Sequence, residues 1–270
     1  MVDFFGLTMV KVERQAKILQ HVREQGFVNN GELAEMFDVS LVTIRRDLRS
    51  LGRQKLIKLE HGGAAAVDYL ASAVEPLYET KAYLNADRKA AIGLAAAALI
   101  QDDDTVVFDA GTTVLRVAQK VKEIGFNHLT VITNDTMIAN ELCPVAHFDV
   151  ILLGGRIRTS YYNTFGPFNE MMLKTLKADK VFLGVDAASL RRGISNLQLE
   201  EIAVKQRMIE ISDEVIAVTD SSKFGLDFPY QVCKWDRVHA LVTDADISKE
   251  FLDLFDSLGI RTKVVLSGKD

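Results

Sequence analysis

The chain has 270 residues, of which 48% are hydrophobic and 26% charged, and its net charge is −5. This length favours two domains, the longest apolar run (residues 90–100) is too short to span a bilayer, and residues 1–8 lack the basic start and apolar core of a signal peptide. Two distant cysteines, Cys143 and Cys233, argue for a reducing compartment rather than a disulfide framework. We therefore expect a cytoplasmic protein that does not associate with membranes.

The positive charge of the chain is concentrated near its N-terminus. Residues 9–63 carry ten Lys/Arg and seven Asp/Glu, a balance of +3, whereas the other residues carry 22 and 30, a balance of −8. This asymmetry places a nucleic-acid surface in the N-terminal part and argues against polyanion binding by the larger part.

Three short helices are predicted within this basic part. Apolar residues at helical spacing indicate one helix around residues 18–22 and a second around residues 33–37, capped by Asn29 or Asn30. A third helix begins after Ser40, whose hydroxyl can accept an otherwise unpaired amide of the first turn. Three such helices in about fifty residues, the last of them basic, are typical of a helix-turn-helix.

The third helix has two chemically different faces. At about 100° per residue, Ile44, Leu48 and Leu51 form a narrow apolar stripe, and the arginines lie opposite it. Residues 40–58 carry one acid, Asp47, against six basic residues: Arg45, Arg46, Arg49, Arg53, Lys55 and Lys58. A solvated charged helix is the alternative interpretation, but the two preceding helices favour DNA binding.

The segment after the third helix predicts a wing. Residues 55–63 (KLIKLEHGG) partly alternate apolar and polar side chains and end in two glycines, which indicates a hairpin. We therefore assign residues 9–63 to a winged helix-turn-helix, 64–84 to a partly helical linker and 85–270 to a second domain. Nearest the bases we expect Thr43, Arg45 and Arg46, with phosphates held by Arg49, Arg53, Lys55 and Lys58.

The second part alternates strands and helices. After a long alanine-rich helix at residues 85–100, seven short runs rich in β-branched residues are separated mostly by helical stretches. They lie at residues 105–108, 129–132, 150–153, 181–185, 215–218, 240–242 and 262–266. Near-continuous apolar strands alternating with helices predict an α/β domain, with a mostly parallel sheet covered by helices on both faces.

Polar residues follow several of these strands, and ligands of open α/β sheets bind beyond the strands' carboxyl ends. Gly111 permits close approach of the backbone, and the amides of Thr112 and Thr113 at a helix start can hold an anion. The strand ends also carry Asp109, Asn134, Gly154, Gly155, Arg156, Asp186 and Lys223. Either Arg156 or Lys223 can neutralise a phosphate, and Asn134 and Asp186 can bond sugar hydroxyls. Together these residues favour a phosphorylated polyhydroxy ligand.

Each of these features has a structural alternative: a threonine that only caps a helix, glycines that only turn the chain, or a solvated lysine. Glu201 and Lys205, four residues apart on a predicted helix, are expected to form a surface pair of little energetic value. The five histidines show no metal-ligand spacing, and neither a Walker loop nor a G-x-G-x-x-G motif is present. We expect neither a metal nor a cofactor.

The chain resembles the DeoR family of bacterial transcriptional regulators. The resemblance spans residues 11 to about 265 and rests on VSLVTIRRDL (39–48), HGG (61–63), EPLYE (75–79), DAGTT (109–113), TND (133–135), LGGR (153–156), GP (166–167), ADKVFLGVD (178–186), EEIAVKQRMI (200–209) and DSSKFG (220–225). It adds His61 to the DNA-binding residues. It also implies a sensor domain similar to ribose-5-phosphate isomerase, with DAGTT as the phosphate loop and with Asp186, Glu200, Lys205 and Lys223 lining a sugar pocket.

Two functions follow. The first is a DNA-binding repressor of a carbohydrate-catabolism operon, active as a dimer or higher homo-oligomer on double-stranded operator DNA and controlled by a phosphorylated sugar. The second is a sugar-phosphate isomerase-like enzyme with an appended DNA-binding domain. In that case Asp109, Asp186 or Glu200 would be the general base, and Lys223 or Lys205 would stabilise an enediolate. We favour the regulator, because fold similarity does not establish chemistry.

Overall fold

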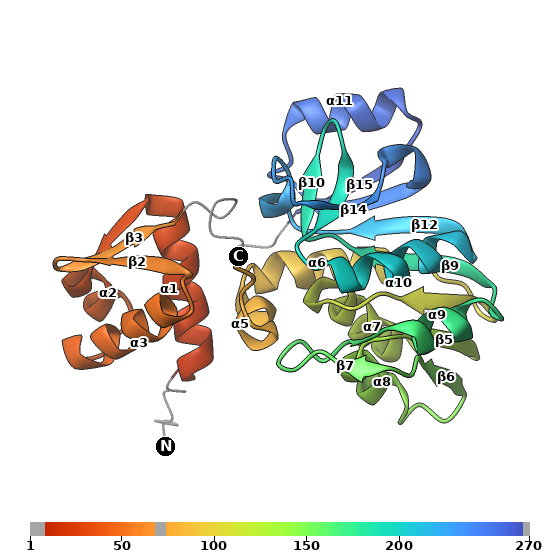
Figure 1. Cartoon of the computed structure of the whole chain (residues 1–270), viewed down its shortest axis with the longest axis horizontal. Helices are drawn as coiled ribbons and strands as arrows, with labels where there is room; N and C mark the ends of the chain where they lie inside the picture. The colour runs from red at the N-terminus through yellow and green to blue at the C-terminus, as the bar shows by residue number, and fades with distance from the viewer. Residues whose placement is uncertain (1–8, 68–73, 267–270) are drawn as a thin grey trace, which may run out of the picture. The chain divides into compact units, whose positions relative to one another are not determined.

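The computed structural model describes residues 9–67 and 74–266, and the chain divides into two compact units, Met1–Leu84 and Asn85–Asp270. Figure 1 shows the elements of both units along the chain. Residues 68–73 of the predicted linker, and the residues before Met9, lie outside the described parts.

The first unit combines helices with a small antiparallel sheet. Its elements are α1 (Lys11–Gln25), β1 (Phe27–Asn29), α2 (Asn30–Met36), α3 (Leu41–Arg53), β2 (Ile57–Glu60), β3 (Gly63–Ala66) and α5 (Tyr78–Tyr83). The strand order is β1-β3-β2, so the predicted wing forms from β2 and β3. Two features differ from the prediction. β1 had not been expected, and residues 64–66 and 78–83 of the segment predicted as a linker belong to this unit.

One apolar core holds the three helices and the wing together. The stripe of α3 (Ile44, Leu48, Leu51) is buried among side chains of α1, α2 and the sheet. α2 begins with a capping box, in which the Asn29 side chain accepts from the Gly31 amide at 2.6 Å and Glu32 accepts from the Asn29 amide. The predicted helix-turn-helix is therefore present.

The second unit is an α/β domain. In the order of the chain, its main elements are α6 (Ala86–Ala97), β4 (Thr105–Phe108), α7 (Thr112–Ile124), β5 (Leu129–Thr133), α8 (Thr136–Leu142), β6 (Phe148–Leu152), α9 (Pro167–Leu173), β9 (Ala178–Gly184), α10 (Leu199–Glu210), β12 (Ser212–Val218), β14 (Ala240–Asp244), α11 (Lys249–Ser257) and β15 (Arg261–Val265). The seven strands form one sheet in the order β15-β14-β12-β9-β4-β5-β6, with every neighbouring pair parallel. This confirms the predicted fold class.

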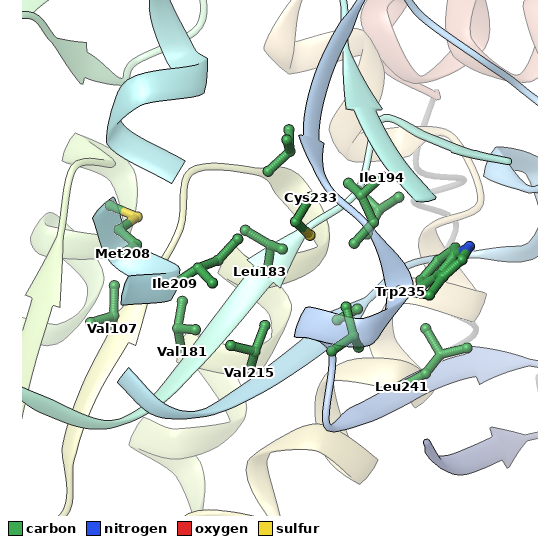
Figure 2. Close-up of a cluster of buried hydrophobic side chains, with 14 of the residues drawn as sticks. Val107, Val181, Leu183, Ile194, Met208, Ile209, Val215, Cys233, Trp235 and Leu241 are labelled. Atoms are coloured by element: carbon green, nitrogen blue, oxygen red, sulfur yellow. The ribbon is translucent and has the colours of Figure 1, made fainter. Parts of the chain in front are cut away.

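Helices cover both faces of this sheet because alternate strand residues point to opposite faces. Val106 and Phe108 pack with α6, α7 and α8, whereas Val107 between them packs in the cluster formed with α9, α10 and α11. Figure 2 shows part of this second cluster, including Val107, Val181 and Val215 of the sheet and Met208 and Ile209 of α10.

Two small sheets accompany the main sheet. β7 (Arg156–Ile157) pairs with β8 (Thr164–Phe165), and a second sheet has the order β10-β11-β13. The strands of the second sheet are β10 (Ala187–Ser189), β11 (Gly193–Asn196) and β13 (Tyr230–Cys233). Because β7 and β10 follow the ends of β6 and β9 in the chain, both sheets continue from the carboxyl edge of the main sheet, where the candidate ligand residues were predicted.

Candidate DNA interface and candidate effector site

The recognition helix α3 presents its arginines to solvent. Arg45, Arg46, Arg49 and Arg53 are all exposed, whereas Ile44, Leu48 and Leu51 are buried. Ser40 is the N-cap, as predicted, and its hydroxyl accepts from the Thr43 amide at 3.2 Å. The two hydroxyls also lie 3.0 Å apart, so Thr43 contributes to the cap and is only partly exposed.

A buried ion pair fixes α3 against α1. Asp47, only 1% exposed, accepts from Arg14 Nε at 2.7 Å and from Gln15 Nε2 at 2.9 Å. The one acid of the basic segment therefore faces inward, and its charge is compensated away from the arginine face. Because this acid is buried, no carboxylate of α3 lies among the exposed arginines.

The segment that follows α3 adds two exposed lysines and an exposed histidine. Lys55, Lys58 and His61 are all exposed, and Lys58 forms a surface pair with Glu60 at 2.7 Å. That neighbour raises the pKa of Lys58, so it remains cationic. Arg49 and Arg53 line a hollow together with Gly52 and Leu59. An added Cβ on Gly52 would lie 3.0 Å from Leu59 Cγ, so glycine allows the wing to approach the helix.

In the second unit, Asp109 and Lys205 form a buried ion pair at the carboxyl edge of the sheet. Asp109 follows β4 and is 1% exposed, and Lys205 projects from α10 and is 5% exposed. Asp109 Oδ2 accepts from Lys205 Nζ and from the Gly184 amide at 2.9 Å. Burial raises the pKa of Asp109, although the ammonium and the amide oppose this effect.

Three carboxylates keep Lys205 charged. Burial would lower its pKa, but Asp109, Asp186 and Glu201 raise the pKa above its ordinary value. We therefore treat Lys205 as an ammonium at neutral pH. Asp186, which follows β9, is partly buried and belongs to the same electrostatic cluster. Asp109, Asp186 and Lys205 are thus brought together as predicted, whereas their binding roles remain a prediction.

The DAGTT loop (residues 109–113), for which phosphate binding is predicted, leads into the first turn of α7. Gly111 is the N-cap, with φ +152, and no side chain caps this helix. Thr112 and Thr113 form the first turn, so their amides lie where a helix dipole attracts an anion. Lys89 of α6 was not predicted as a site residue, yet it is 4% exposed and donates to Thr112 Oγ1 at 3.1 Å.

Asp135 supports the same loop from the end of β5. Its Oδ2 accepts from the Gly111 amide at 3.1 Å, and its Oδ1 accepts from Met137 at 2.8 Å and Ile138 at 3.2 Å, which caps α8. Burial raises the pKa of Asp135 to about 7, while the three amides favour the carboxylate. One side chain therefore orients both the DAGTT loop and the start of α8.

The neighbouring predicted residues have structural tasks. Asn134 donates to the Thr164 carbonyl at 3.0 Å and is 3% exposed. An added Cβ on Gly155 would lie 2.5 Å from the Phe165 carbonyl oxygen, so the β7–β8 hairpin needs glycine there, and Gly154 accepts from Asn169 at 3.0 Å. Arg156 is exposed and lies 5.3 Å from the ring centroid of Phe165.

Lys223 belongs to a polar network at the ends of β12 and β14. Burial would raise the pKa of Asp220, but the charges of Lys223 and Lys89 lower it. Asn85 donates to Asp220 Oδ1 at 2.8 Å. Arg88 donates to Ser221 Oγ at 2.7 Å and to Asp244 at 3.1 Å. The N-cap and first turn of α6 therefore carry three side chains, at positions 85, 88 and 89, that reach this edge of the sheet.

The prediction for Glu201 and Lys205 was wrong. Both side chains are buried, and Lys205 bonds to Asp109 instead of forming a surface pair. Glu201 accepts from Arg158 Nη1, Asn163 Nδ2 and Asn196 Nδ2, each at 2.9 Å. Glu200, the residue predicted to line the pocket, is exposed on α10. The sequence correctly placed both glutamates on a helix, but it did not predict which of them faces solvent and which is buried.

Several buried side-chain oxygens of the second unit accept no hydrogen bond. Within the described residues, the Oδ1 atoms of Asp109, Asn134, Asn163 and Asn169 are buried and make no hydrogen bond. Unpaired buried acceptors are costly unless a donor reaches them. A ligand with several hydroxyl donors matches them, and the lysines and the α7 amides match an anion.

Neither a metal cluster nor a membrane-spanning helix is found in residues 9–67 and 74–266. No group of three His, Cys, Asp or Glu side chains is placed to hold an ion, and no described helix is long and apolar enough to cross a bilayer.

Comparisons with known proteins cover both units. Residues 14–69 match the DeoR-like helix-turn-helix domain, and residues 84–245 match the DeoR C terminal sensor domain. The putative aga operon transcriptional repressor of Escherichia coli O157:H7 is 34% identical over 259 residues, which are 95% of this chain and 94% of the relative. The glycerol-3-phosphate regulon repressor of Escherichia coli strain K12 is 32% identical over 237 residues, 88% of this chain and 92% of the relative. Ribose 5-phosphate isomerase A of Methanocaldococcus jannaschii aligns with TM-score 0.38 and 13% identity over 52% of this chain and 55% of that one.

Proposed function

The chain belongs to the DeoR family of transcriptional regulators, and we propose that it is a repressor of carbohydrate-catabolism genes whose affinity for operator DNA is controlled by a phosphorylated sugar. The observation that carries the effector class is the uncapped first turn of α7 beside the buried ammonium of Lys89. A buried cation and free helix amides favour an anion with several acceptor oxygens, which a phosphate group provides.

The phosphate and the sugar hydroxyls of the ligand would bind to different residues. The phosphate would bind the amides of Thr112 and Thr113, with Lys89 and Lys223 as cations, while Asp135 holds Gly111 in place. The sugar hydroxyls would bond Asp109, Asn134 and Asp186, near the Lys205 ammonium. Arg156 is exposed and stacks on Phe165, and Glu200 is exposed on α10, so we give both a peripheral role.

On DNA, the exposed face of α3 would enter the major groove. Arg45 and Arg46 would contact base edges with Thr43, and Arg49, Arg53, Lys55, Lys58 and His61 would hold phosphates together with Ser40 at the helix start. One module contacts few base pairs, so we propose that the protein acts as a homo-oligomer in the cytoplasm, on an operator with repeated half-sites.

The sugar phosphate changes DNA affinity only if the DNA-binding and the released states bind it differently. We propose that the released state binds it more tightly, which relieves repression. Two relatives that cover 95% and 88% of this chain carry the names of repressors, which supports repression rather than activation.

Fluorescence anisotropy tests this function. The full chain is titrated, at fixed salt because phosphate contacts make affinity steeply salt-dependent, onto duplex DNA from upstream of its own gene. The titration is repeated with pentose, hexose and triose phosphates and with the unphosphorylated compounds. We expect one phosphorylated compound to weaken DNA binding while its unphosphorylated form does not. Tight DNA binding that no member of the panel changes would refute the effector class, and turnover of a sugar phosphate would favour an enzyme.

A further inference from the structure

An exposed valine lies on the arginine face of α3, at the N-terminal end of the helix. Val42 is 65% exposed, the highest exposure of any large apolar side chain described in the first unit. At about 100° per residue it lies roughly 160° from the buried Ile44. The arginines at 45, 46, 49 and 53 span roughly 100° to 200° on the same wheel, so Val42 is within their arc.

Exposed apolar side chains are common and need no explanation when they are scattered singly. Val42 differs because it lies among the arginines that are expected to contact DNA. It precedes Arg45 and Arg46 by three and four residues, so these side chains are its neighbours on the helix surface. It is also in the first turn, the part of a recognition helix that reaches the base edges.

We propose that Val42 is a specificity-determining residue that contacts the C5-methyl group of a thymine in the operator, an inference that rests on DNA binding through α3. Its side chain can neither donate nor accept a hydrogen bond. It therefore favours the one base that presents a methyl group in the major groove and disfavours cytosine, whose amino group would lose its hydrogen bond to water.

The test removes only the C5-methyl group of thymine from the DNA. The full chain selects duplexes from a random library at fixed salt, and each thymine of the selected site is then replaced by uracil, which has the same hydrogen-bonding groups. Wild-type protein should bind about fourfold more weakly when the contacted thymine is replaced, because burying one such group contributes roughly 0.8 kcal/mol. Val42→Ala should be clearly less sensitive to this replacement, because its shorter side chain loses most of the contact with the methyl group. Alanine is a good helix former, so the variant keeps the fold.

Leu41→Ala is the matched control. Leu41 is 45% exposed in the same turn but lies roughly 60° from Ile44, outside the arginine arc. This variant should retain the wild-type sensitivity to uracil. The proposal is overturned if wild-type protein shows no uracil-sensitive thymine, or if Val42→Ala keeps the same sensitivity. Failure to select any duplex would refute DNA binding itself, and the proposal with it.

Discussion

Replacing Asp47 by alanine tests whether the buried ion pair holds the recognition helix in place. The change leaves Arg14 and Gln15 without their acceptor, and their residues are 8% and 6% exposed. Removing one partner of a buried pair typically costs about 3–5 kcal/mol. Arg14 retains a weak bond to the Met9 carbonyl at 3.4 Å, so we expect the lower end, about 3 kcal/mol. A unit of this size has a free energy of unfolding of roughly 4–13 kcal/mol, so a loss of about 3 kcal/mol would remove between about a quarter and three-quarters of it.

The assay separates the two units within one sample. The single tryptophan, Trp235, is buried in the second unit and donates to the Ser189 carbonyl at 2.9 Å. Its fluorescence therefore reports the second unit, whereas helical circular dichroism reports both. Asp47→Ala should lower the urea midpoint of the first unit by about 3 M, at about 1 kcal/mol per molar urea, and leave the tryptophan transition unchanged.

Asp47→Asn is the control, because it keeps an oxygen for Gln15 but loses the charge that faces Arg14. Its effect should be smaller than that of alanine. An unchanged midpoint for Asp47→Ala would refute the role of the pair, and a shifted tryptophan transition would show that the two units do not unfold independently.

Three further predictions concern the two sites. Lys89→Met should raise the half-saturating concentration of the effector roughly tenfold or more, because a charge-assisted hydrogen bond contributes about 1.5–3 kcal/mol. It should leave the DNA affinity of the sugar-free protein unchanged. An unaltered effector response in anisotropy would exclude Lys89 from the site. Because the folded pKa of Asp135 is raised to about 7, its contribution to stability should be lost as pH rises from about 4 to about 7. Asp135→Asn should flatten that slope in tryptophan-monitored urea unfolding, and equal slopes would contradict the assignment. Arg46→Ala should reduce the affinity ratio between operator and scrambled duplex by about tenfold or more while sugar binding survives, and an unchanged ratio would remove Arg46 from the base-reading set.

The elements with strong local signals were predictable from the sequence. Ser40 caps α3 as its hydroxyl and position indicated, and all seven β-branched runs became strands of one parallel sheet. β1 was missed because three residues carry no clear period. It exists because it pairs with β3, and an added Cβ on Gly63 would lie 2.0 Å from the Val28 carbonyl oxygen.

The site residues depended on tertiary packing, which spacing alone does not show. Lys89 lies in an alanine-rich helix, where the sequence alone favours a solvated lysine. In the structure, α6 packs so closely on α7 that an added Cβ on Gly93 would lie 2.7 Å from the Arg116 backbone. That approach buries Lys89 beside Thr112. Similarly, the four-residue spacing of Glu201 and Lys205 suggested a pair, whereas the strand ends supply better partners for each.

If the proposed function is right, sugar binding and DNA binding are coupled, and calorimetry of the effector measures this coupling. The identified sugar phosphate is titrated into the full chain, free and saturated with operator duplex. Coupling is reciprocal, so we expect operator DNA to weaken sugar binding by the same factor by which the sugar weakens DNA binding. Equal sugar affinity for the free and the DNA-bound protein would contradict it.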